Sequence, residues 1–216
     1  EDKIKDLVNL SIKEDCNIFV ALNRRSYCSI RYVKENIIKD GGAISCHFNF
    51  TEAISKLKID SYSENTLNFW GLSNSIHVID SVFYLIGTPK ELNPNIFQPT
   101  LNWHKSGTIF NGNGVSESGT IFSYDANWCA PGRWGIQIMT KKKKYILSPL
   151  ESVQEQNMES FNLSVAKIKD DIDKFFKPGF FLQTRNFHEK NYSELCSIKE
   201  YYDIFKNTTL IFDYKV

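Results

Sequence analysis

The sequence predicts an α+β fold in which a large, mostly antiparallel sheet is accompanied by helices. Three observations lead to this prediction. The first half of the chain alternates segments of helical and strand periodicity. Residues 95–158 form strand-like runs with short, turn-like separators, as consecutive antiparallel strands require. Two helical stretches then close the chain.

The composition is that of an ordinary globular protein with one large domain, or with a domain and an incomplete neighbour. The 216 residues are 42% hydrophobic and 24% charged, with a formal net charge of +1. This balance gives no electrostatic reason to expect nucleic acid or an anionic membrane as a partner. The lysine run at residues 141–144 is interpreted as a solvated hairpin turn rather than a polyphosphate site.

The five cysteines are odd in number, widely spread and without a Cys-x-x-Cys pair. We therefore expect free thiols, no metal site and a cytoplasmic location.

The first 22 residues resemble the end of an α/β unit. Residues 1–16 place apolar side chains at helical spacing but begin inside the periodic pattern without a cap. Residues 17–22 are a continuous apolar run, typical of a strand that is buried on both faces. We expect the parallel neighbour of this strand to precede Glu1.

A second helix is predicted from Ser26 or Tyr27 to Lys39, and residues 43–52 alternate as a strand. Further strands are predicted at residues 95–104, 108–111, 119–128, 132–140, 144–150 and 151–158, with a turn at 112–114. Helices are then predicted from Pro178 to about Glu189 and from the capping box at Ser197 toward Leu210. Residues 167–177 fit either a helix or a loop.

The most informative segment is a predicted helix over residues 74–87, which carries His77 in its first turn. With Asn74 or Ser73 as the cap, the positive end of the helix dipole disfavours imidazolium and keeps the ring neutral. Asp80 lies one turn later on the same face, where it could orient the ring. His77 is thus a candidate catalytic residue, the alternative being a histidine that only satisfies a helix end.

Four segments of the sequence carry a resemblance to a known family. They are residues 20–25 (Val-Ala-Leu-Asn-Arg-Arg), 74–87, 123–135 and 176–181. They resemble the glucose-fructose oxidoreductase and inositol dehydrogenase (Gfo/Idh/MocA-like) family over the C-terminal two thirds of its members. The two middle segments are the more specific, and the resemblance extends over nearly the whole chain.

The resemblance implies two parts. Residues 1–22 would be the tail of a truncated Rossmann domain. Residues 23–216 would be a substrate-binding and oligomerisation domain with a large open sheet and helices on one face. Neither a Gly-x-Gly-x-x-Gly fingerprint nor a Glu-Lys-Pro segment occurs in the sequence. We therefore expect NAD or NADP to bind the full-length protein and not this chain alone, and the cofactor-binding residues are unknown.

By the same resemblance, His77 matches the family histidine that acts as base beside the substrate hydroxyl. The family has an aspartate four residues earlier, where this chain has Ser73. A serine can form a hydrogen bond but lacks the charge that would raise the basicity of the ring.

Further candidate substrate-binding residues come from three places. They follow the strand predicted at residues 17–22, lie among the strands predicted at residues 95–158, or lie at the start of the Pro178 helix. An arginine at a strand end could contact a sugar hydroxyl, a carboxylate or a nucleotide phosphate, or lie in a solvated turn. Tryptophans on a sheet could stack on a sugar, or face a core or a subunit contact. The candidate substrate-binding residues are Asn23, Arg24, Arg25, Ser73, Asn74, Asp80, Trp128, Arg133, Trp134, Lys177 and Gln183.

The leading interpretation is the substrate-binding and oligomerisation part of an NAD(P)-dependent oxidoreductase. It would act on a secondary alcohol of a sugar, cyclitol or nucleotide-sugar, and this chain alone would be inactive. The alternative is a non-catalytic carbohydrate-binding or scaffolding module, favoured by Ser73 and by the absent fingerprint. We also expect a homo-oligomer through the open face of the sheet. The apolar residues expected there are Phe110, Ile121, Phe122, Tyr124, Trp128, Trp134, Ile136 and Ile138.

Overall fold

The computed structural model describes residues 1–97 and 101–215. The helices are α1 (Asp2–Lys13), α2 (Cys28–Lys39), α3 (Glu64–Asn68), α4 (Ile76–Ile86), α5 (Asp171–Phe175), α6 (Phe180–His188) and α7 (Ile198–Phe212). The strands are β1 (Phe19–Val20), β2 (Ser45–Phe50), β3 (Pro89–Phe97), β4 (Ile109–Ser116), β5 (Ile121–Asn127), β6 (Trp134–Met139), β7 (Lys143–Leu147), β8 (Gln154–Asn157), β9 (Ser164–Val165) and β10 (Cys196–Ser197). Two shorter turns matter for the site, η1 (Asn23–Ser26) and the π-helical turn η4 (Gly71–Ser75).

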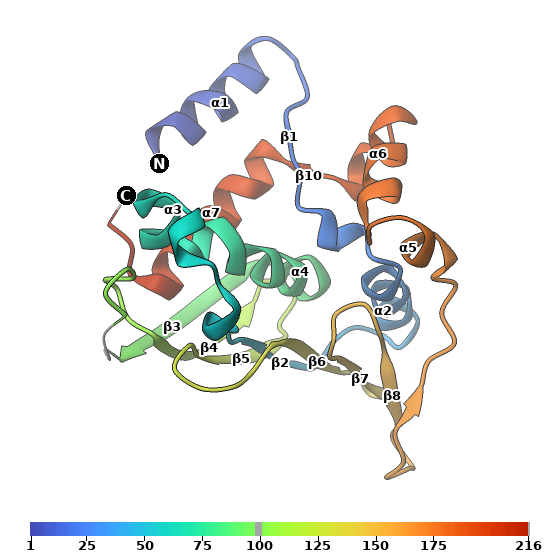
Figure 1. The fold of residues 1–216 in the computed structure, drawn as a ribbon. Coiled ribbons are helices and arrows are strands. Elements are labelled where there is room, and N and C mark those ends of the chain that lie inside the picture. Colours follow the sequence, from blue (N-terminus) through green and yellow to red (C-terminus); the bar gives the residue numbers. More distant parts are fainter. Residues whose placement is uncertain (98–100, 216) are drawn as a thin grey trace.

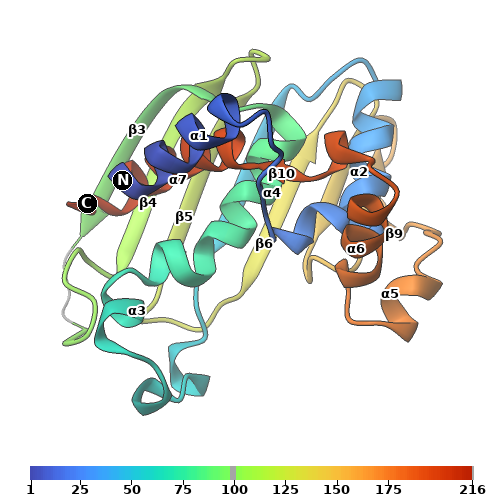
Figure 2. The same cartoon turned by 90° about the horizontal axis from the view of Figure 1, so that it is seen from above.

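Within the described residues, eight strands form one sheet in the order β3-β4-β5-β2-β6-β7-β8-β9. Strands β2 and β5 pair in parallel, and the other neighbours pair antiparallel. The labelled helices lie on one side of this sheet, which Figure 1 shows edge-on and Figure 2 shows from above. The predicted α+β architecture, with a large, mostly antiparallel sheet and helices on one face, is confirmed.

The core lies between the sheet and helices α2, α4 and α7. Side chains alternate along β2, so that Phe48 and Phe50 are fully buried while their neighbours are half-buried. Phe48 meets Phe83 of α4 edge to face, with ring centroids 6.2 Å apart, and Phe50 packs on Phe212 of α7 at 5.4 Å.

The expected apolar character of the open face is wrong. Phe110, Phe122, Tyr124, Trp128, Ile136 and Ile138 are at most 2% exposed and belong to the helix-covered core. Trp134 points to the same side, and of the eight expected residues only Ile121 is exposed. The large side chains of these strands fill the space under the helices, where their burial removes apolar surface from water. Ile121 and Phe122 are adjacent in β5 and therefore lie on opposite faces.

The open face is instead mostly polar. His47 of β2 lies 3.0 Å from Ser123 and 3.0 Å from Asp125, both on the neighbouring strand β5. Asn93 of β3 donates to the side chain of Asn113 of β4 at 3.2 Å. The apolar side chains of Ile121 and Met139 are also exposed on this face.

The predicted turn at residues 112–114 is also wrong, because β4 continues through it to Ser116. Gly112 and Gly114 face the core, where a Cβ atom would collide with the Tyr124 hydroxyl and the Glu91 carbonyl respectively. These glycines permit close packing within a strand rather than a turn.

Other boundaries differ from the prediction. β3 begins at Pro89, directly after Gly87 ends α4 with φ +86°, and it ends at Phe97. The predicted strand at 95–104 thus overlaps β3 only at its start, and residues 98–100 lie outside the described residues. β8 covers only Gln154–Asn157 of the predicted 151–158.

At the C-terminal end, α6 starts after Gly179, and the capping box of Ser197 and Glu200 at the start of α7 is confirmed.

Residues 1–22 lie beside the C-terminal segments. β1 has two residues and pairs antiparallel with β10, in place of the predicted six-residue strand. The backbone turns soon after β1, where Leu22 N–H donates to Val20 O at 2.8 Å, and η1 follows. α1 runs next to α7 and buries none of its side chains fully (Figure 2). The assignment of this segment to a Rossmann domain, and the boundary at residue 22, stay predictions.

In the described part of the chain, no helix is both long enough and apolar enough to cross a membrane.

Gly71, at the start of η4, lies so close to Phe212 that an added methyl group would overlap the ring. We expect Gly71→Ala to lower the free energy of unfolding by about 1–3 kcal/mol, as overpacking does. Urea denaturation measures this change. Gly135→Ala is the control, because a Cβ there would lie 3.6 Å from its nearest neighbours. It should change stability by no more than about 0.5 kcal/mol, and equal losses would show that the Phe212 contact is not tight.

Candidate functional site

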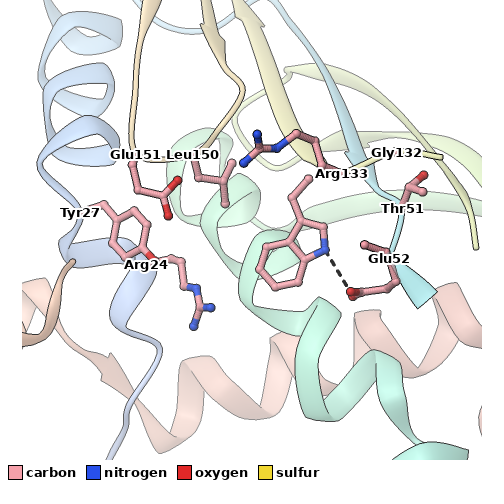
Figure 3. A pocket seen from close by; sticks show the side chains of 10 residues that line it. Arg24, Tyr27, Thr51, Glu52, Gly132, Arg133, Leu150 and Glu151 are labelled. Carbon is pink, nitrogen blue, oxygen red and sulfur yellow. Dashed lines mark hydrogen bonds between the residues drawn. The ribbon is translucent and has the colours of Figure 1, made fainter. Parts of the chain in front are cut away.

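A cavity of ≈ 280 Å³ opens where β2 ends and β6 begins (Figure 3). β2 and β6 are antiparallel neighbours with Phe50 opposite Trp134, so the residues after β2 face those before β6. Turn η1 and the segment after β7 complete the wall. The lining residues are Arg24, Tyr27, Thr51, Glu52, Ala53, Gly132, Arg133, Trp134, Leu150 and Glu151. Of the predicted candidates, Arg24, Arg133 and Trp134 therefore meet in one cavity.

Glu52 was not predicted, although it is an acidic residue directly after an alternating strand. Its side chain is 6% exposed. The carboxylate accepts hydrogen bonds from Asn74 Nδ2 at 3.1 Å and from Ser75 Oγ at 2.7 Å. It also accepts one from Trp134 Nε1 at 3.3 Å, the dashed line in Figure 3. Burial raises the pKa of Glu52, although the hydrogen bonds from these donors act to lower it. The carboxylate thus ties η4 to the end of the sheet.

Arg24 is half-buried and held from two sides. Its Nη1 donates to Asn23 Oδ1 at 2.9 Å, and its guanidinium lies 5.6 Å from the Trp134 ring centroid. Asn23 is itself buried and donates to Pro178 O at 3.0 Å. Among the described residues, no carboxylate lies within ion-pair distance of Arg24. The guanidinium is therefore positioned but not neutralised.

Arg25 differs completely from its neighbour. Its Nε and Nη2 donate to Asp80 at 2.8–3.1 Å, and its Nη1 lies 3.3 Å from Glu200. Arg25 is 4% exposed and Asp80 is fully buried. The Arg25 guanidinium also lies 4.9 Å from the Tyr84 ring centroid. The two side chains satisfy each other, an arrangement that favours a structural role over substrate contact.

The expected cap at the start of the histidine helix is wrong. η4 runs directly into α4, Ser75 has helical backbone angles, and no side chain caps Ile76. Asn74 bonds to Glu52, and Ser73 Oγ donates to Thr66 O at 3.3 Å. Because helical turns precede α4, His77 does not lie at a free helix N-terminus. The dipole of α4 is therefore not what keeps the His77 ring neutral.

His77 is neutral for a different reason. Burial, and secondarily the charge of Arg24, lower its pKa to about 4. Asp80 turns to Arg25 instead of His77. The Nδ1 atom of His77 is buried and has no hydrogen-bond partner among the described residues. A buried ring nitrogen without a partner is uncommon and marks a group that a ligand could satisfy.

His77 is not among the residues that line the cavity, and the remaining predicted residues do not line it either. Trp128 is 2% exposed and donates its Nε1–H to Phe50 O at 3.2 Å. Lys177 is exposed, with its ammonium 4.5 Å from the Phe180 ring centroid. Gln183 is half-buried on α6. Trp128 is thus a core residue with a satisfied indole.

Helix starts are the usual places for the pyrophosphate of a dinucleotide. The starts of α2, α6 and α7 are already satisfied by side chains. Asp173 accepts from the backbone N–H of Cys28 at 2.7 Å and of Gly179 at 2.9 Å. At the start of α7 the Ser197 hydroxyl and the Glu200 carboxylate fill the same role.

The Arg25–Asp80 pair leads to a stability prediction. Asp80→Asn leaves a buried guanidinium without its counter-charge and should lower the free energy of unfolding by about 3–5 kcal/mol. Asp203→Asn is the matched control, because the Asp203–Lys206 pair at 2.8 Å is exposed. It should cost at most about 1 kcal/mol. Chemical denaturation of both variants decides the matter, and a loss below 1 kcal/mol for Asp80→Asn would contradict the structural role.

The lowered pKa of His77 makes stability depend on pH. Between about pH 6.5 and pH 4 the unfolded chain binds a proton that the folded chain does not, so stability falls as the pH is lowered through this range. His77→Asn removes this contribution. Its loss of stability from about pH 7 to about pH 5 should therefore be smaller than that of the wild type, by about 1–2 kcal/mol. Denaturation curves at both pH values measure the difference, and parallel pH profiles would rule out the buried neutral ring.

No protein-family model and no curated protein matches the sequence. Solved structures do match. One is an oxidoreductase from Agrobacterium radiobacter in complex with NAD+, L-tartaric acid and magnesium (TM-score 0.76, 14% identity, 98% of this chain and 66% of that chain). Another is the UDP-N-acetylglucosamine 3-dehydrogenase GnnA from Acidithiobacillus ferrooxidans (0.73, 8%, 98% and 66%). A third is the WlbA dehydrogenase from Chromobacterium violaceum with NADH and UDP-GlcNAcA (0.69, 14%, 97% and 62%).

The chain spans about two thirds of the length of these structures. At such low identity the likeness concerns the fold. The resemblance to Gfo/Idh/MocA-like oxidoreductases is thus confirmed at the level of the fold, which this chain shares with these dehydrogenases over almost its whole length.

Proposed function

We propose that this chain is the substrate-binding and subunit-association part of an NAD(P)-dependent oxidoreductase. The substrate is a secondary alcohol of a sugar, a cyclitol or a nucleotide-linked sugar. The proposal rests on the shared fold and on one observation in particular. His77 has a neutral imidazole whose Nδ1 has no hydrogen-bond partner among the described residues, and the charge of Arg24 acts on this ring. It lies in the first turn of α4, directly after the turn η4 that Glu52 binds.

The chemistry assigned to this chain is proton transfer and orientation. Oxidation of the alcohol removes a hydride from carbon and a proton from oxygen, and NAD or NADP, when bound, would supply the acceptor for the hydride. His77 takes the hydroxyl proton, which requires the neutral ring that the site provides. Arg24 and Glu52 offer a donor and an acceptor that fix the orientation of the substrate hydroxyls. NAD or NADP would be bound by residues outside this sequence.

A non-catalytic carbohydrate-binding or scaffolding module is the second candidate, favoured by Ser73. Its hydroxyl is exposed and bonds to the Thr66 carbonyl, so it contributes no charge to the ring of His77. Such a module would keep the cavity and the sheet but not the proton transfer.

Subunit association through the open face of the sheet remains part of the proposal. The polar rows that contain His47, Asn113 and Asp125 do not argue against it, because interfaces as a whole are no more apolar than other protein surface.

The functional test uses the longest gene product that contains residues 1–216. We expect it to reduce NAD+ or NADP+ in the presence of a sugar or polyol, measured by the absorbance of the reduced nicotinamide. His77→Asn should lower kcat by about 10²–10⁴-fold with little change in KM, as expected for loss of a general base. The 216-residue chain alone should show no saturable fluorescence change with NADH.

Lys3→Gln on the exposed helix α1 is the control and should leave the rate unchanged. Equal rates for wild type and His77→Asn would remove His77 from the reaction. Sugar binding without nicotinamide reduction would favour the module.

A further inference from the structure

The two consecutive arginines of η1 have opposite environments. Arg25 uses its guanidinium on Asp80 and Glu200, whereas Arg24 uses only Nη1, on an uncharged amide. A guanidinium carries five N–H donors in a planar fork that matches a carboxylate. Arg24 therefore has unused, charged donors on the wall of the cavity, in a position fixed by Asn23 and Trp134.

A second guanidinium, that of Arg133, lines the same cavity from the segment before β6. Figure 3 shows Arg24, Arg133 and Glu151 on three different elements around the cavity, with the Arg24 guanidinium directed away from the other two side chains in this view. Among the described residues, Arg133 forms no ion pair. The cavity is therefore lined by two guanidinium groups, neither of which forms an ion pair within the described residues, and by the two carboxylates of Glu52 and Glu151.

The cavity also offers acceptors. Glu151 is exposed on its wall, and Glu52 is buried at its edge next to the indole of Trp134. Carboxylates accept hydrogen bonds from hydroxyl groups, and an indole face packs on the C–H face of a sugar. One cavity thus combines charged donors for an anion with acceptors for hydroxyls.

We infer that the ligand of this cavity is a polyhydroxy acid of monosaccharide size. Its carboxylate pairs with Arg24 in the field of Arg133, and its hydroxyls are bound by Glu52 and Glu151. This inference rests on the proposed function and narrows its substrate class. The volume of ≈ 280 Å³ is at the lower end of the range for small-molecule sites, about 300–1,000 Å³, and suits a single sugar acid.

A bound carboxylate also acts on His77. The charge of Arg24 is one of the two causes that keep the ring deprotonated. An anion paired with Arg24 offsets that charge and makes the ring a better proton acceptor. Binding of the acid therefore prepares His77 for proton transfer, whereas a neutral polyol does not.

The experiment titrates the 216-residue chain with D-gluconate and with D-glucitol, which differ in one carboxylate. The indole N–H of Trp134, assigned with Trp134→Phe, and the ring C–H of His77 are followed by NMR. We expect gluconate to bind at least about tenfold more tightly, the scale of a charge-assisted hydrogen bond. Gluconate should also raise the midpoint of the His77 titration, and glucitol should not.

Arg24→Gln should remove the preference for the acid, and Arg24→Lys should restore part of it because the charge returns without the fork. Lys3→Gln, which removes a positive charge from exposed α1, should keep the preference. His104 is buried away from this cavity and bonded to Gly107 and Tyr214, so its signal should not respond.

Equal binding of gluconate and glucitol would overturn the inference and leave the proposed function standing. Tighter binding of D-glucitol 6-phosphate than of gluconate would overturn it in favour of a sugar phosphate. If no compound moved the signals of Trp134 or His77, both the inference and the proposed site would fall.

Discussion

The buried ion pair of Arg25 and Asp80 is the interaction on which the site depends, because it joins η1 to α4 where neither charge reaches water. Arg24 is the neighbour of one partner, and His77 lies one helical turn before the other. The Arg25–Asp80 ion pair therefore sets the separation of Arg24 and His77. Glu200 adds a contact from the first turn of α7, so three elements are fixed around one guanidinium.

Glu52 provides a second fixed point, on the turn η4 that directly precedes α4. It accepts hydrogen bonds from Asn74 and Ser75 of the π-helical turn and from Trp134 of β6. π-helical turns are rare and occur often at functional sites, since they offset the side chains that follow. A buried carboxylate that binds this turn to the sheet fixes the start of α4, and with it the backbone that carries His77.

The fold could be predicted from the sequence because strand alternation and helical periodicity are local. The site could be predicted only in part, because its contacts are distant in sequence. Arg24 and Arg25 follow the same strand end and are equivalent by pattern. Asp80 and Glu200, which distinguish them, lie 55 and 175 residues away. The partners of Glu52, namely Asn74, Ser75 and Trp134, lie 22, 23 and 82 residues further on.

The neutrality of His77 was predicted, but for the wrong reason, and the difference bears on function. A helix dipole would be a permanent influence, whereas one of the two actual causes is the charge of Arg24. Ser73 supplies no counter-charge, and the carboxylate of Glu52 is engaged by three other donors. Burial is built into the fold, so Arg24 is the influence that a ligand can change. The capacity of His77 to accept a proton therefore depends on what binds to Arg24, which couples recognition of the substrate to its chemistry.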